Sequence, residues 1–84
     1  MANQLVARKK EHFEKLARCL GGRLHRCPVN GWEMIVADPT KTQGSVVVPL
    51  TSSFWRQEAM PTTTADWEDA IVEMVEEGWI SSAV

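Results

Sequence analysis

The sequence predicts an α+β fold, a two-layer sandwich with the order α-β-β-β-α, in which two helices cover an antiparallel three-stranded sheet. Three observations lead to this prediction. Both ends of the chain show helical periodicity, the middle contains three extended runs, and an Asn-Gly pair separates the first two runs. The chain is short enough that residues 1–84 are expected to form a single domain.

The first element is expected to be an amphipathic helix within residues 3–20. Its apolar residues recur on one face, at Leu5, Val6, Phe13, Leu16, Ala17 and Leu20. Two glycines follow at positions 21 and 22, and glycine is the residue that most often ends a helix. Glu11 and Lys15 have the spacing of an ion pair within a helix, so the polar face fits solvent as well as a partner.

The runs at residues 23–29 and 32–37 are predicted strands joined by a two-residue turn at Asn30 and Gly31. Asn-Gly favours the type I′ turn because both of its central residues need positive φ. Counting outward from the turn gives three cross-strand pairs on one buried face: Val29 with Trp32, Cys27 with Met34, and His25 with Val36.

The third strand is predicted within residues 45–50, antiparallel to the second, with Pro49 at its end or at a bulge. The segment 51–62 fits two descriptions. It is either a fourth short strand or an excursion that carries Phe54 and Trp55 over the sheet.

The last element is expected to be a helix that begins with Thr63 or Thr64 as its cap and ends at Gly78. Trp79 then lies where a Schellman contact with Met74 is expected. The apolar stripe of this helix is Trp67, Ala70, Ile71, Met74 and Val75. Its last turn is acidic, although the helix dipole disfavours anions there, so helix electrostatics does not account for these carboxylates.

The order of helix, three strands and helix resembles the double-stranded-RNA-binding domain, in element order only. The resemblance implies a lysine-rich start to the second helix, where that family contacts phosphates. Residues 62–70 read TTTADWEDA at this place and are acidic, so no binding residue of that family is assigned to this chain.

The composition, 44% apolar and 24% charged, is typical of soluble globular proteins. No apolar run reaches the roughly 18–20 residues of a membrane span, and the N-terminus lacks the apolar core of a signal peptide. A cytoplasmic protein with reduced cysteines is therefore expected. A chain this short has little room for a core and a substrate cavity, which favours binding over catalysis.

Four potential metal ligands, His12, Cys19, His25 and Cys27, fall within sixteen residues. Their spacing is not that of the paired ligands in structural zinc sites, so neither a metal nor another cofactor is predicted. His25 and Cys27 are both expected on the buried face of the sheet. They are therefore poorly placed for nucleophilic catalysis in a cleft.

The charge is divided along the chain, although the net charge is only −2. Residues 1–30 carry seven cations and two anions, whereas residues 31–84 carry two cations and nine anions. The predicted fold would place a basic half beside an acidic half. Such a protein can present a charged face to another protein, or it can pair head to tail with a second copy as a homodimer.

The leading hypothesis is a small non-enzymatic regulator or inhibitor that binds another protein through a charged face. Small acidic proteins of this kind are often encoded by phages and other mobile elements, where an acidic helix can mask the nucleic-acid site of a host protein. The candidate partner-binding residues are aromatic, arginine and glutamate side chains in the second half of the chain: Phe54, Trp55, Arg56, Glu73, Glu76, Glu77 and Trp79.

The alternative hypothesis is a nucleic-acid-binding protein that uses the basic N-terminal helix. Its candidate residues are Arg8, Lys9, Lys10, Lys15 and Arg18. The negative charge of the remaining chain opposes this alternative, because it lies within a few Debye lengths of the helix.

Overall fold

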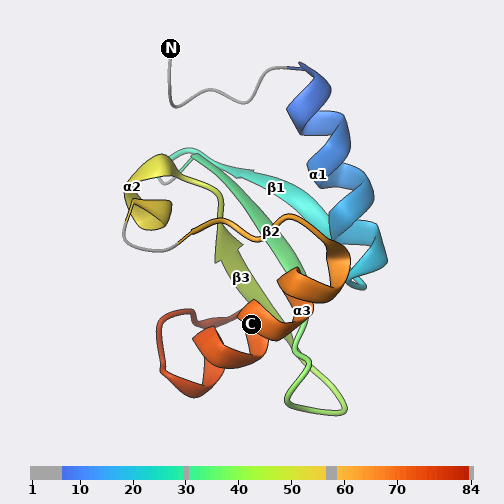
Figure 1. Cartoon of the computed structure of the whole chain (residues 1–84), viewed down its shortest axis with the longest axis vertical. Coiled ribbons are helices and arrows are strands. Elements are labelled where there is room, and N and C mark those ends of the chain that lie inside the picture. Colours follow the sequence, from blue (N-terminus) through green and yellow to red (C-terminus); the bar gives the residue numbers. More distant parts are fainter. Residues whose placement is uncertain (1–6, 30, 57–58, 84) are drawn as a thin grey trace.

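A computed structural model describes residues 7–29, 31–56 and 59–83, and the side chains of residues 7–9, 52 and 83 lie outside this description (Figure 1). Leu5, Val6 and Asn30 therefore fall outside the described residues, as do the side chains of Arg8 and Lys9. The elements follow in the order α1 (Ala7–Cys19), β1 (Arg23–Cys27), β2 (Gly31–Ala37), β3 (Ser45–Pro49), α2 (Ser52–Trp55), α3 (Thr64–Glu76) and β4 (Ser82–Ala83).

The predicted α+β fold, with the order helix, three antiparallel strands and helix, is confirmed. Two short elements add to it. A single helical turn, α2, follows β3, and the two-residue strand β4 pairs with β3 to give the sheet order β1-β2-β3-β4. None of the helices in the described part of the chain has the length and apolar character needed to cross a bilayer.

The predicted two-residue turn between β1 and β2 is wrong. Cys27 pairs with Gly31 in the structure, so the connection occupies residues 28–30 and Gly31 is the first residue of β2. Pro28 gives the physical reason, because its fixed φ favours the second position of a turn that starts at Cys27. Gly31 has the positive φ that the sequence predicts, +81°, but at a strand position.

The new register moves the side chains of β1 to the opposite face, because a shift by an odd number of residues exchanges the two faces of a strand. His25 lies opposite Glu33 and Leu24 lies opposite Met34. The predicted buried positions of His25, Cys27 and Val29 are therefore wrong. His25 and Cys27 are half-buried on the other face, and Val29 is 88% exposed.

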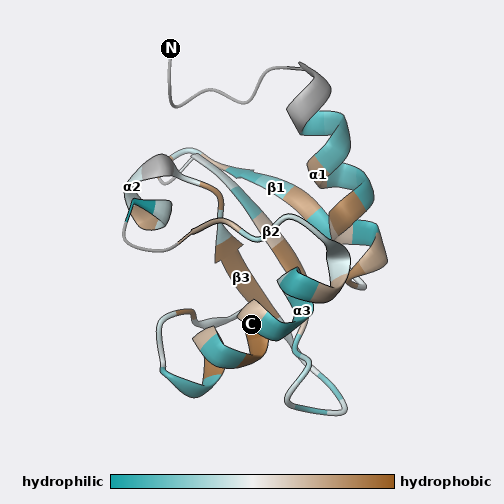
Figure 2. Ribbon diagram, in the orientation of Figure 1, coloured by the Kyte–Doolittle hydropathy of each residue, from teal (hydrophilic) through white to brown (hydrophobic). Residues whose placement is uncertain are grey.

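The core lies on one face of the sheet, beneath α1 and α3 (Figure 2). Its central residues come from β2 and β3, where Met34, Val36, Val46 and Val48 are at most 1% exposed. The two helices and the residues just after α1 and β3 supply the other buried residues, Phe13, Leu16, Ala17, Leu20, Leu50, Trp67, Ile71 and Met74. Both helices thus pack on the same face, which is consistent with two layers.

The helix ends follow the sequence prediction. Thr63 caps α3, and its hydroxyl accepts a hydrogen bond of 3.1 Å from the backbone nitrogen of Asp66. Gly78 has a φ of +77°, and the backbone nitrogen of Trp79 donates to the carbonyl oxygen of Met74 at 2.8 Å, as in a Schellman motif. Gly21 ends α1 in the same way, with a φ of +80°.

The segment after β3 is an excursion rather than a fourth strand, and it takes the form of α2. The indole nitrogen of Trp55 donates to the carbonyl oxygen of Pro49 at 2.8 Å, and its ring meets that of Trp67 edge-on at 5.3 Å. Phe54 and Trp55 are half-buried against the core. The helical turn therefore covers one end of the core.

Candidate functional site

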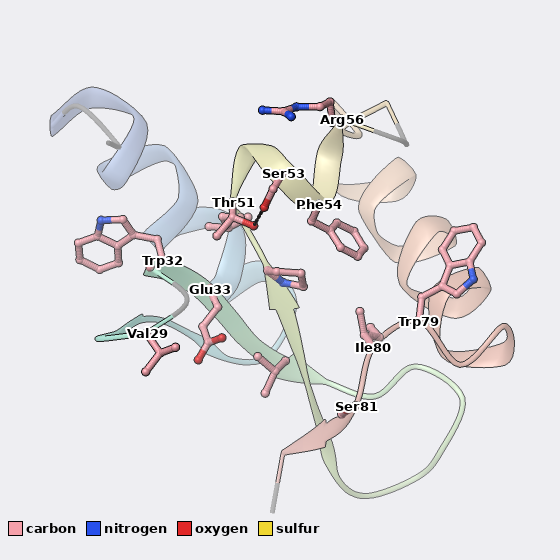
Figure 3. Close-up of a pocket in the computed structure, with 14 residues that line it drawn as sticks. Val29, Trp32, Glu33, Thr51, Ser53, Phe54, Arg56, Trp79, Ile80 and Ser81 are labelled. Atoms are coloured by element: carbon pink, nitrogen blue, oxygen red, sulfur yellow. Dashed lines mark hydrogen bonds between the residues drawn. The ribbon is translucent and has the colours of Figure 1, made fainter. Parts of the chain in front are cut away.

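An open groove of about 1020 Å³ lies on the face of the sheet that carries Glu33 (Figure 3). Its floor is formed by outward-facing residues of β2 and β3, among them Glu33, Val47 and Pro49. Phe54 lines it on the side of α2, and residues 79–81 line it on the side of the C-terminal segment. The groove thus joins three parts of the chain that are distant in the sequence.

Two backbone features place the groove walls. Gly78 reverses the chain after α3, so that the backbone nitrogen of Val47 donates to the carbonyl oxygen of Ser81 at 3.1 Å. At the other end of β3, the carbonyl oxygen of Pro49 accepts the indole N–H of Trp55. Because the backbone nitrogen of Val47 and the carbonyl oxygen of Pro49 on the outer edge of β3 already have partners, the groove offers side chains more than a strand edge for an added strand.

Glu33 places a carboxylate in an otherwise largely apolar floor. Its side chain is 12% exposed, and one carboxylate oxygen lies 3.1 Å from Nδ1 of His25, whose side chain is 43% exposed. A carboxylate can accept about four hydrogen bonds. In the described part of the chain, His25 is the one side chain that hydrogen-bonds it, so Glu33 keeps acceptor capacity toward the groove.

The rim of the groove exposes apolar surface. The described residues include three large exposed hydrophobic side chains, and two of them, Val29 and Trp79, line this groove. Trp79 is 47% exposed. Exposed aromatic surface beside a concave site is typical of protein-binding regions.

The predicted partner-binding residues separate into three places. Phe54, Arg56 and Trp79 line the groove. Trp55 does not line it, because its indole packs on Trp67 and its N–H is bonded to Pro49. The three predicted carboxylates lie exposed on or just beyond the last turn of α3, outside the groove, at positions 73, 76 and 77.

These carboxylates belong to a longer acidic stripe along α3. We define the acidic stripe as Asp66, Asp69, Glu73, Glu76 and Glu77, all of them exposed. Their spacing of three and four residues places them on the helix face opposite the buried Trp67 and Ile71. No lysine or arginine in the described part of the chain lies within 4.0 Å of a stripe carboxylate. The stripe is therefore a face of one charge sign.

The described cations of α1 do not form a comparable face. Lys10, Lys15 and Arg18 are exposed, but Glu11 lies among them on the same arc of the helix. The ammonium of Lys10 lies 5.2 Å from the ring centre of Trp32, a cation–π contact to a half-buried side chain. Two of the five predicted nucleic-acid-binding side chains, those of residues 8 and 9, lie outside the described residues.

The four potential metal ligands are not gathered at one site in the described part of the chain. His12 stacks edge-on against Phe13, His25 contacts Glu33, and no disulfide joins Cys19 to Cys27. Within the described ranges, no three histidine, cysteine, aspartate or glutamate side chains gather as they would around a metal ion.

The sequence prediction missed the groove because its walls, α2 and residues 79–81, come from parts of the chain that local sequence patterns do not bring together. The lining residues it missed include Glu33 and Val47 of the floor and Ile80 of the wall. One signal was present, since Glu33 is the only charged residue in the apolar run of β2. A charged side chain in such a strand indicates a face that is not part of the core.

A second buried carboxylate, Asp38, lies in the turn after β2. The hydroxyl and the backbone nitrogen of Thr40 both donate to it, at 2.6 and 2.8 Å. These two hydrogen bonds, with a smaller contribution from nearby Lys41, lower the pKa of Asp38 below its ordinary value.

The lowered pKa of Asp38 gives a pH-dependent contribution to stability. The folded protein holds the charged form, so this contribution is present above the ordinary aspartate pKa of about 3.9 and is lost as the pH falls through the lower folded pKa. We expect Asp38→Asn to reduce the melting temperature at pH 6, and the difference from wild type to shrink below about pH 4. Thermal unfolding at both pH values measures this, and a difference that grows with acid would contradict it.

Comparison with known proteins adds no homologue to this description. No family model, no curated protein and no solved structure matches the chain.

Proposed function

We propose that this chain is a non-enzymatic regulator or inhibitor that binds another protein through a charged face, the acidic stripe of α3. The observation that supports the proposal best is the stripe itself, five exposed carboxylates without a cationic partner in the described part of the chain. Its partner would present a basic surface. The nucleic-acid site of a host protein, masked by a phage-encoded or mobile-element-encoded inhibitor, is a surface of that kind.

The stripe has an energetic cost that folding alone does not explain. Like charges three or four residues apart on a helix each cost a few tenths of a kcal/mol. Glu76 and Glu77 add to this cost at the end of α3, where the helix dipole disfavours anions and the last turn holds no basic residue. A basic partner would convert this repulsion into attraction, and its approach would be accelerated by the field of the stripe.

Nucleic-acid binding by α1 is the second candidate, favoured by the exposed side chains of Lys10, Lys15 and Arg18. Two observations count against this candidate. Glu11 lies among these cations, and Lys10 is in contact with Trp32. This candidate predicts a steep loss of affinity with salt, and loss of binding on Lys9→Glu with Lys10→Glu.

The test is a pull-down from a lysate of the native host with the tagged chain, with and without nuclease treatment. We expect a specific protein to be retained after nuclease treatment, and the triple variant Glu73→Lys, Glu76→Lys, Glu77→Lys to lose it. Cations at the end of α3 complement the helix dipole, so this variant should be at least as stable as wild type. Loss of binding would then not reflect unfolding.

The matched control makes the same change in net charge away from the stripe, at Glu11, Glu14 and Glu68, each replaced by lysine. It is expected to retain the partner. Capture of the partner by the stripe variant at the wild-type level would exclude the acidic stripe as the binding face, and recovery of nucleic acid in place of protein would favour α1. Light scattering of the purified chain tests the predicted homodimer separately.

A further inference from the structure

We propose that the groove beside α2 accepts an arginine side chain of the partner protein. The guanidinium would contact the carboxylate of Glu33, and apolar residues next to that arginine in the partner would pack against the groove walls. The inference rests on the proposed protein-binding function. It extends that function from the acidic stripe to the groove, by naming the side chain that the partner would place there.

The carboxylate of Glu33 is the first reason. It is 12% exposed among apolar floor residues, and such a group is costly to hold away from water unless it gains a cation and further hydrogen bonds. His25 supplies one hydrogen bond and carries a positive charge only when protonated. A guanidinium has five N–H donors and can satisfy the remaining acceptor sites.

The groove walls are the second reason. Phe54 and Trp79 line the groove (Figure 3), and the apolar residues Val47 and Pro49 also line it. A guanidinium is planar and weakly hydrated, and it stacks on aromatic faces, whereas the ammonium of lysine is a compact and strongly hydrated charge. The mixture of one carboxylate and exposed aromatic surface therefore favours arginine over lysine.

The surrounding charge is the third reason. Trp79 follows the acidic stripe after a single glycine, so the groove rim lies next to Glu76 and Glu77 in the chain. Among the described residues, Arg56 is the one cation that lines the groove; it is exposed on the rim beside α2, whereas Glu33 lies on the floor (Figure 3). An acidic segment of a partner would be repelled by Glu33 and by the acidic stripe. Charge complementarity therefore favours a basic segment.

The test uses two short peptides as probes, acetyl-Leu-Arg-Leu-amide and the same peptide with citrulline, which has nearly the shape of arginine without its charge. Each is titrated into the full ¹⁵N-labelled chain and followed by amide shifts and the indole N–H of Trp79. We expect the shifts to cluster at the groove, and the arginine peptide to bind about tenfold more tightly.

Two variants locate the guanidinium. Glu33→Gln keeps the shape and a hydrogen bond to His25, and it is expected to bring the arginine peptide to the affinity of the citrulline peptide. Trp79→Ala removes an exposed side chain and is expected to weaken both peptides. Glu68→Gln, an exposed carboxylate of α3 outside the groove, is the matched control and should change neither affinity.

Several results would overturn the inference. These are equal affinity for the two peptides, no binding at millimolar concentration, a preference for acetyl-Leu-Glu-Leu-amide, or arginine binding that survives Glu33→Gln. Concentration-dependent shifts at the groove without peptide would assign it to a second copy of the chain instead.

The two proposals fail separately. If Glu33→Gln leaves the arginine preference intact while the stripe variant still loses the partner, only the groove inference fails. If the stripe variant keeps the partner while the peptide results are as expected, the acidic face is excluded and the groove inference stands.

Discussion

Replacement of Gly22 by alanine is expected to cost about 4 kcal/mol of unfolding free energy, or to prevent folding. A Cβ at this position would overlap the carbonyl oxygen of Ile35 and would lie 2.6 Å from the Cα of Val36. These are backbone atoms of the central strand β2, which cannot move aside without disturbing its pairing with β1 and β3. Chemical denaturation followed by circular dichroism measures the loss.

Gly78→Ala is the matched control for this prediction. A Cβ at Gly78 would meet no atom within 4 Å, so alanine there costs only the strain of a positive φ, about 1 kcal/mol. Gly22→Ala therefore measures the cost of a steric clash, and Gly78→Ala measures the cost of backbone strain alone. Equal losses at the two positions would show that the backbone at Gly22 does not approach β2 as closely as described.

Trp67→Ala is expected to destabilise the protein by about 3–5 kcal/mol. Trp67 is 1% exposed, and its ring meets Phe13 edge-on at 6.3 Å and Trp55 at 5.3 Å. It therefore joins α1, α2 and α3 in one cluster. Since proteins of this length have roughly 4–13 kcal/mol of total stability, this one substitution should remove a large share of it.

Trp79→Ala removes the same side chain from an exposed position and is expected to cost less than about 1 kcal/mol. Thermal unfolding of both variants compares them directly. If the two losses were similar, the cluster around Trp67 would not be the core that the structure indicates.

The helices were predictable from local signals. Thr63, Gly78 and Gly21 lie at helix ends whose hydrogen bonds join residues at most five positions apart. Such local bonds depend on the residue types at the helix ends, which can be read from the sequence. The apolar periodicity of α1 and α3 likewise depends only on residues within each helix. The order of helix, three strands and helix therefore followed from sequence alone, whereas the short elements α2 and β4 did not.

The strand register and the groove were not predictable in the same way. Asn30 and Gly31 favour one turn, whereas Pro28 favours another turn that starts earlier. The choice between the two registers depends on which faces of β1 and β2 meet the core. The wall of the groove formed by residues 79–81 depends on a pairing with β3, more than thirty residues away in the chain. The candidate residues Phe54, Arg56 and Trp79 were identified by type, but their common location was not.

The closed outer edge of β3 has a consequence for behaviour at high concentration. An uncovered strand edge recruits strands from other molecules and leads to aggregation. Here the indole of Trp55 and the carbonyl of Ser81 occupy that edge, while β1, at the opposite edge, carries two arginines and is followed by Pro28. The segments that shape the groove therefore also keep the sheet from growing, so that loosening either wall would promote fibril formation.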